Sequence, residues 1–269
     1  KWIDREDLGN HLATDRYFGA LLDEDGGHLH PLNYVLGLSA AAVEAGVTIY
    51  EESRVTEVVD GSKPVVKTED GTVTAEYVVL AGNAYLGDLS KSLAAKIIPV
   101  DTCIIATEPL GAARAKSLMM TEACVSDTNY NLDYFRLSAD NRLLYGGRDK
   151  LVSGRKMAGT ALKDNMLATF PQLDDVKVEY IWGGRVAVTR NLLPDVGRWG
   201  NIYYAHGYSG QGVPLSAIAG RVIGEAIAGD AGRFDVFARI PHKPFPGGTA
   251  LRVPLLSLAR LYYEFRDAL

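Results

Sequence analysis

Three closely spaced glycines, Gly207, Gly210 and Gly212, mark the stretch of sequence best suited to bind a ligand. The apolar run at residues 202–205 predicts a strand before them, and the apolar spacing over residues 214–229 predicts a helix after them. Unpaired N–H groups at the start of such a helix can bind a phosphate or the electron-rich edge of a flavin. From spacing alone, a connection whose glycines only permit close packing is an equally good interpretation.

A second glycine turn follows another predicted strand. The continuous apolar run at residues 77–81 predicts a strand buried on both faces, and residues 82–85 form a turn after it. Ligands of open α/β sheets bind near the carboxyl ends of the strands, so the two turns predict a ligand site there. Neither turn has the GxGxxG spacing of the dinucleotide fingerprint, which occurs nowhere in the chain.

Other patterns typical of catalysis or metal binding are absent from the sequence. It contains no G-x-S-x-G, HExxH or CxxC motif, and His28 and His30 have no further ligands nearby, so no metal site is predicted. We interpret His206 and His242 as hydrogen-bonded structural residues, not as bases. The sequence therefore names no catalytic acid or base.

Composition argues against partnership with nucleic acid or a membrane. The 269 residues have a net charge of -5 and no basic cluster. No apolar run approaches the roughly 20 residues that span a bilayer. The two cysteines, Cys103 and Cys124, fit buried thiols in a reducing, cytoplasmic compartment, although the sequence also allows one disulfide.

The order of elements predicts a mixed α/β (α+β) protein with two discontinuous domains. Residues 25–93 and 201–231 form the first domain, which contains both glycine turns. It also contains a helix over residues 31–46 and a short strand over residues 47–50.

The second predicted domain, residues 96–191, is a mostly antiparallel sheet interrupted by one helix over residues 159–170, which stops at Pro171. Its strand-like runs are residues 98–107, 132–137, 142–147 and 176–188, and residues 140–141 predict a hairpin turn. Residues 235–269 are predicted to form a loop and then, from Pro254, an amphipathic helix. The apolar stripe of that helix favours a core or subunit contact, so an oligomer could form through it.

Several short segments, taken together, resemble the flavoprotein superfamily of D-amino-acid oxidase, glycine oxidase and sarcosine oxidase. Each match is modest, but their order along the chain is specific. The segments are GHLHP at 27–31, RVTEV at 54–58, AGNAY at 81–85, WGG at 182–184 with Thr189 and LPDVG at 193–197, and HGYSGQG at 206–212. Further stretches resemble the subgroup that oxidises gamma-glutamylputrescine: DRYFGALLD at 15–23, AGNAYLGD at 81–88, DNRLLYGG at 140–147, and FPGG at 245–248 with LRVP at 251–254.

The resemblance implies that the first domain is a partial FAD-binding domain and the second a substrate domain. It implies noncovalent FAD, because no cysteine occupies the position that carries the flavin in covalent relatives. The implied cofactor-binding residues are Val55, Ala81, Gly82, Gly207, Tyr208, Ser209, Gly210, Gln211, Gly212 and Val213. The expected aromatic walls around the substrate are Tyr134, Trp182 and Tyr208.

One departure from the family concerns the substrate. Val186 stands where glycine and sarcosine oxidase-type members have an arginine that binds the substrate carboxylate. Arg185 is adjacent, and on a strand it faces the opposite side. The resemblance therefore implies a small-molecule amine, such as gamma-glutamylputrescine, whose carboxylate lies far from the reacting carbon.

The implied reaction is hydride transfer from the carbon that carries a neutral primary amine to the flavin. Hydrolysis of the imine gives an aldehyde and ammonia, and reoxidation by oxygen gives hydrogen peroxide. The alternatives are a glycine or sarcosine-type amino-acid oxidase and a noncatalytic, flavoprotein-like binding module.

The second departure concerns the start of the chain. Residues 1–10 look like the middle of a polar, helical segment, and we expect a further segment before Lys1. In the family, a βαβ unit with the GxGxxG turn holds the pyrophosphate of FAD. Without that unit, we expect the 269 residues to bind FAD weakly or not at all and to be inactive alone.

Overall fold

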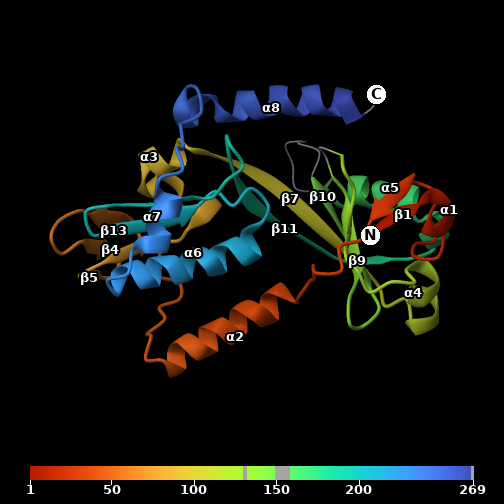
Figure 1. Cartoon of the computed structure of the whole chain (residues 1–269), viewed down its shortest axis with the longest axis horizontal. Helices are drawn as coiled ribbons and strands as arrows, with labels where there is room; N and C mark the ends of the chain where they lie inside the picture. The colour runs from red at the N-terminus through yellow and green to blue at the C-terminus, as the bar shows by residue number, and fades with distance from the viewer. Residues whose placement is uncertain (130–131, 149–157, 268–269) are drawn as a thin grey trace. The chain divides into compact units, whose positions relative to one another are not determined.

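The computed structural model describes residues 1–129, 132–148 and 158–267 (Figure 1). The chain divides into two compact units. The first unit comprises Lys1–His30, Asp101–Gly184 and Leu261–Leu269, and the second comprises Pro31–Val100 and Arg185–Arg260. The predicted domains coincide with these units only in part. Residues 25–30 belong to the first unit, and residues 96–100 and 185–191 belong to the second.

Most of a five-stranded sheet, in the order β11-β7-β10-β9-β8, belongs to the first unit, whereas the start of β7 and the end of β11 belong to the second. Its strands are β7 (Ile97–Thr107), β8 (Val125–Ser126), β9 (Tyr134–Leu137), β10 (Leu143–Arg148) and β11 (Val178–Thr189). The pairs β7–β10, β9–β10 and β8–β9 are antiparallel, which confirms the predicted arrangement. Asn141 lies in the hairpin turn between β9 and β10 with a φ of 60°, a conformation that asparagine tolerates.

One face of this sheet forms the core of the first unit. Phe135 and Tyr145 lie opposite each other on adjacent strands, and their stacked rings are 5.5 Å apart. Helix α5 (Ala158–Thr169) contributes Leu162 and Met166 to the same core. These two side chains are one helical turn apart and both are fully buried. The helix ends just ahead of the proline that was predicted to stop it.

The start of the chain differs from its prediction. Residues 1–10 were expected to be helical, but Trp2 pairs with Leu21 in a two-stranded antiparallel ladder, and only one helical turn follows. A strand of this kind depends on a partner about twenty residues away, which no local pattern reveals. The remaining elements of the first unit are β1 (Trp2–Asp4), α1 (Arg5–Leu8), β2 (Gly19–Leu21), α4 (Ala112–Leu118) and η3 (Pro171–Leu173).

The second unit contains two three-stranded sheets. Figure 1 shows α6 (Gly212–Ile227) and α7 (Gly232–Ala238) packed along the sheet whose order is β12-β13-β6. That sheet consists of β12 (Asp195–Trp199), β13 (Ile202–His206) and β6 (Val78–Leu80). The other sheet and the short helices are β3 (Glu57–Val59), β4 (Val65–Lys67), β5 (Thr72–Thr74), η1 (Asn83–Tyr85), η2 (Gly87–Leu89) and α3 (Lys91–Ala94).

One helix of the second unit was predicted correctly, and two other predictions for this unit are wrong. Helix α2 (Pro31–Glu44) forms as predicted but has no buried residue. Residues 47–50 form no strand, because a strand needs a hydrogen-bonded neighbour and none pairs with them among the described residues. Val79 of β6 is 44% exposed, so this strand is buried on one face and not on both.

The C-terminal segment was predicted incorrectly as well. Part of the expected loop forms α7, and the last helix, α8, runs over Gly248–Asp267 with Pro254 inside it, not at its start. The side chains of Leu258, Leu261 and Phe265 on α8 are exposed. An oligomer formed through α8 remains a prediction. None of the described helices is long and apolar enough to cross a membrane.

Candidate functional site

Two glycine turns meet at one edge of the β12-β13-β6 sheet. Strands β13 and β6 are parallel, with Tyr203 opposite Val79. The turns that follow the two strands therefore leave the sheet at the same end. The turn after β6 contains Asn83, and the turn after β13 begins at Gly207. The backbone N–H of Gly207 donates to Oδ1 of Asn83 at 2.9 Å, so the two turns are bonded directly.

The backbone of the second turn has a shape that requires glycine. Gly207 and Gly210 have φ angles of 75° and 98°, which L side chains rarely adopt. A Cβ atom on Gly207 would also clash with Cγ2 of Thr189. Ser209 then attaches the turn to β11, because its N–H donates to the carbonyl of Ala187 at 2.9 Å. Torsion and packing together therefore determine the path of this turn.

The start of α6 is open to a ligand. The residue before the helix, Gln211, makes no side-chain cap hydrogen bond, and the first turn contains no acidic residue. Gly210, Gln211 and Val213 are exposed, and a Cβ on Gly210 would meet no atom within 4 Å. Because no side chain caps the start of α6, its first N–H groups and the positive end of the helix dipole can accept an electron-rich group. The residues present therefore fit the electron-rich edge of a flavin.

Tyr208 does not take the position expected of a substrate wall. Its side chain is only 7% exposed and packs in a core cluster with Tyr203, Val222 and Phe234. This burial raises the pKa of Tyr208 to about 12. Because the ring points into the core beside α6, only the backbone of Tyr208 remains a candidate for cofactor contact.

The other predicted residues lie in separate places. Ala81 and Gly82 belong to the first of the two joined turns, whereas Val55 precedes β3 in the other sheet and is half-buried. Tyr134 and Trp182 belong to the first unit, on β9 and β11. The structure thus brings together Ala81, Gly82 and residues 207–213, and their role in binding FAD stays a prediction.

Tyr134 and Trp182 differ in how firmly they are held. The Tyr134 hydroxyl lies 3.0 Å from Oγ1 of Thr102, and its ring occupies the space over Gly146, where any Cβ would clash with it. Burial raises the pKa of Tyr134. Trp182 is 45% exposed. Their role as substrate walls also remains a prediction.

The sequence did not predict a charged cluster of Lys96, Asp195 and His206 that lies directly before the second turn. The Asp195 carboxylate is 3% exposed, and its Oδ2 accepts from both Nζ of Lys96 and Nε2 of His206 at 2.9 Å. Burial alone would raise the pKa of Asp195, but the hydrogen bonds from His206 and Lys96 lower it below its ordinary value. The cluster ties the first residue of β12 to the last residue of β13, immediately before Gly207.

The two histidines of this region were expected to be hydrogen-bonded structural residues. The side chain of His206 is 1% exposed and bonded to Asp195, whereas its Nδ1 has no partner among the described atoms. Nε2 of His242 also lacks one, and burial lowers the pKa of this histidine. The sequence does not predict the pair of Asp195 and His206, because polar residues at two strand ends reveal no partner until the strands are paired.

We expect the substitution Gly207→Ala to destabilise the chain by about 2 to 4 kcal/mol, because it adds both backbone strain and a clash with Thr189. Urea unfolding followed by circular dichroism would measure the change. Gly220→Ala is the matched control, since a Cβ there meets no atom within 4 Å and alanine suits the middle of α6. Equal stabilities of the two variants would contradict the packing described here.

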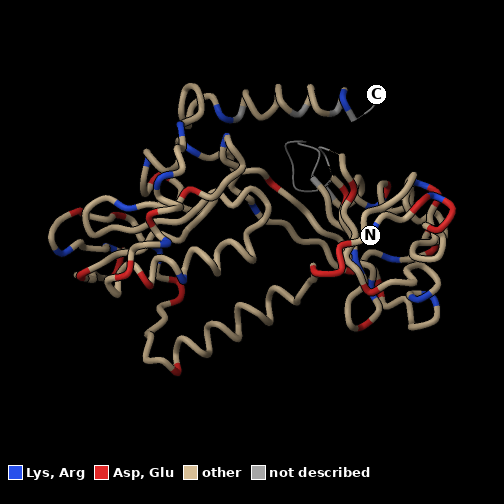
Figure 2. Tube along the Cα trace, viewed as in Figure 1, with Lys and Arg blue, Asp and Glu red and all other residues tan. Residues whose placement is uncertain are grey.

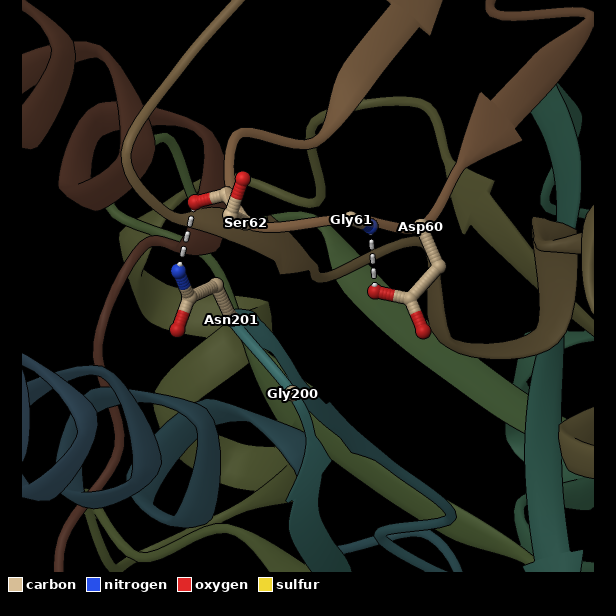
Figure 3. A pocket seen from close by; sticks show the side chains of 5 residues that line it. All are labelled: Asp60, Gly61, Ser62, Gly200 and Asn201. Atoms are coloured by element: carbon tan, nitrogen blue, oxygen red, sulfur yellow. Dashed lines mark hydrogen bonds between the residues drawn. The ribbon is translucent and has the colours of Figure 1, made fainter.

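A shallow hollow elsewhere in the second unit is a weaker candidate. Its volume is about 400 Å³, and Asp60, Gly61, Ser62, Gly200 and Asn201 line it (Figure 3). The hollow precedes β13, at the opposite end of that strand from the joined turns. Its polar groups already bond to one another: the Asn201 amide donates to the Ser62 carbonyl at 3.0 Å. No predicted site residue lies there, and the described residues include no cluster of three metal-ligating side chains.

Comparison with protein families identifies the class of protein. The family of FAD dependent oxidoreductases (DAO) matches residues 1–226. The chain belongs to this family. The uncapped start of α6 fits the electron-rich edge of the flavin that the family's name implies.

Comparison with individual proteins shows which members of the family this chain resembles. The chain is 47% identical to gamma-glutamylputrescine oxidoreductase of Escherichia coli (strain K12), over 99% of this chain and 63% of that protein. It is 44% identical to the probable oxidoreductase OrdL of Haemophilus influenzae, over 98% of this chain and 62% of that protein. The crystal structure of glycine oxidase from Geobacillus kaustophilus shares the fold, with a TM-score of 0.72 and 20% identity. The match covers 85% of this chain and 62% of the glycine oxidase chain. The chain thus spans less than two thirds of the length of each of these relatives.

Proposed function

We propose that this chain forms part of an oxidoreductase that uses FAD to oxidise a primary amine similar to gamma-glutamylputrescine. The products would be an aldehyde, ammonia and hydrogen peroxide, with oxygen as the electron acceptor and water as the source of the aldehyde oxygen. The main support for this substrate is the 47% identity to the E. coli oxidoreductase, which extends over 99% of the chain.

The joined turns supply the residues that would hold the cofactor. Ala81, Gly82 and the backbone of residues 207–213 would contact FAD, which when bound supplies the two-electron oxidation of the amine carbon. The N–H groups at the start of α6 would stabilise negative charge that develops in front of them. The turn needs no reorganisation to do this, because Asn83 and β11 already hold it.

The two cysteines are compatible with noncovalent binding. Cys103 is buried in the core of the first unit and Cys124 is exposed, and neither forms a disulfide within the described part of the chain. Neither belongs to the joined turns, which lie in the second unit. We propose that the protein holds FAD through hydrogen bonds and packing alone.

A glycine or sarcosine-type activity is the second candidate, because glycine oxidases share this fold. Val186 is the observation that weighs against it. The side chain at this position on β11 is apolar and half-buried, so it offers no bidentate partner to an amino-acid carboxylate. A noncatalytic module would instead bind neither FAD nor an amine.

The test uses a completed chain, defined as these 269 residues joined to the part of the E. coli relative that they do not match. We expect peroxide formation with gamma-glutamylputrescine and much slower formation with glycine or sarcosine. The same assay without amine, and on the 269 residues alone, provides the controls. Turnover of glycine or sarcosine but not of gamma-glutamylputrescine would contradict the proposed substrate, and no flavin uptake by the completed chain would favour the noncatalytic module.

A further inference from the structure

The face of the first unit's sheet that lies opposite the core carries a tyrosine and an arginine in register. Tyr134 and Arg136 alternate along β9 with the buried Phe135, so both point away from the core. Tyr134 is opposite Gly146 on β10, and Arg136 is opposite Leu144. Both side chains are half-buried, and they are neighbours on one face of the sheet.

A neutral histidine holds Arg136 in place. Nε2 of His28 lies 2.8 Å from the carbonyl of Glu122, and a carbonyl only accepts, so Nε2 carries the proton. A guanidinium only donates, so Nδ1 of His28 accepts from Nη1 of Arg136. The histidine therefore orients the guanidinium without neutralising its charge.

Among the side chains that the structure describes, no carboxylate pairs with Arg136. Three other arginines of the first unit have one: Arg16 pairs with Asp133 at 3.0 Å, Arg114 with Asp175 and Arg142 with Asp140. A half-buried guanidinium that is held by a neutral ring and has no acid beside it is prepared to receive an anion. A carboxylate suits its planar fork of donors.

We infer that Arg136 binds a carboxylate of the substrate, and that His28 is the positioning residue for this contact. The inference rests on the proposed function and specifies its substrate class as amines with a carboxylate remote from the reacting carbon. A gamma-glutamyl amide has such a group, at the opposite end of the molecule from its primary amine. Val186 is apolar and offers no partner to a carboxylate, whereas Arg136 is a cation that can bind one.

Steady-state kinetics on the completed chain test the inference. The substrates are gamma-glutamylputrescine and N-acetylputrescine, which has the same amide and primary amine but no carboxylate. We expect Arg136→Gln to raise KM for gamma-glutamylputrescine roughly 10- to 100-fold at unchanged kcat and to leave KM for N-acetylputrescine unchanged. Arg136→Lys should recover part of the loss, and His28→Ala should raise only the first KM, by a smaller factor. Arg114→Gln is the matched control and should change neither KM.

A direct binding measurement separates this inference from the proposed function. Gamma-glutamylbutylamine lacks the reacting amine, and its dissociation constant can be measured by calorimetry for wild type and Arg136→Gln. Binding that weakens at least tenfold in the variant supports the inference, even if no amine is oxidised and the proposed function fails. Equal binding by both proteins, no binding by wild type, or an equal rise in KM for both substrates would overturn it.

Discussion

Purified by itself, the 269-residue chain should carry little or no flavin, whereas the completed chain should hold about one FAD per polypeptide. The reason lies in the second unit, where α2 contains no buried residue and leaves Leu32, Val35 and Leu36 exposed. Figure 2 shows no lysine or arginine along this helix, whose single acidic residue is Glu44 at its end. An apolar helix without a charged face needs a covering partner.

Strand β6 also has an apolar face that needs a covering partner. It is the edge of its sheet, and the exposed Val79 lies on the face that is not buried. Covering one large apolar side chain contributes about 1.5 to 3 kcal/mol, so covering several would contribute as much as the whole stability of a small domain. In the completed chain, we expect the added segment to cover both apolar faces.

Three measurements on the two proteins check this prediction. The flavin absorbance of each purified protein gives its FAD content, and fluorescence of a dye that binds apolar surfaces reports exposure of α2. We expect strong dye binding and rapid hydrogen exchange in α2 of the 269-residue chain, and a decrease of both in the completed chain. Equimolar flavin in the 269-residue chain, or unchanged exchange in α2 after completion, would show the prediction to be wrong.

Replacing Asp195 by asparagine should lower the free energy of unfolding by about 3 to 5 kcal/mol, the typical loss when one partner of a buried ion pair is removed. The variant keeps the shape of the side chain but removes the charge that Lys96 and His206 share. Lys96 would then remain a half-buried cation without its carboxylate. Asp140→Asn is the matched control, because that carboxylate is exposed and solvent screens its pair with Arg142, so the loss should be much smaller.

The pH dependence of stability provides a separate check on this cluster. The folded-state pKa of Asp195 is below its ordinary value, so its contribution is complete above that ordinary value and is lost as the pH falls through the folded pKa. For Lys96, burial alone would lower the pKa, but the hydrogen bond to Asp195 raises it. Its contribution is complete below the ordinary lysine value and is lost as the pH rises through the raised pKa.

Urea unfolding at a series of pH values tests both effects. Wild type should lose stability relative to Asp195→Asn in strong acid and again in strong base, with the largest difference between these limits. Parallel curves for the two proteins across the whole range would contradict the cluster described here. A loss in Asp140→Asn as large as that in Asp195→Asn would show that burial does not set the size of the effect.

Local patterns were enough to predict many of the elements and the family. The helix α2, the end of α5 before a proline and the hairpin at Asn141 follow from side-chain periodicity and turn residues, which act within a few positions. The same holds for β13 followed by a glycine turn and α6. The short segments that resemble flavoproteins also needed no tertiary information, since they are contiguous in the sequence.

Only the tertiary structure decided which side chains meet and which faces are covered. Arg136 and His28 are 108 positions apart, and Lys96 and Asp195 are 99 apart, so no spacing rule connects them. Residues 47–50 have a strand-like composition but no partner among the described strands, because a strand is completed by its neighbour. Tyr208 lies in a motif that predicts ligand contact, yet packing against α6 buries its ring. Contacts of this kind depend on the fold as a whole, which sequence periodicity does not encode.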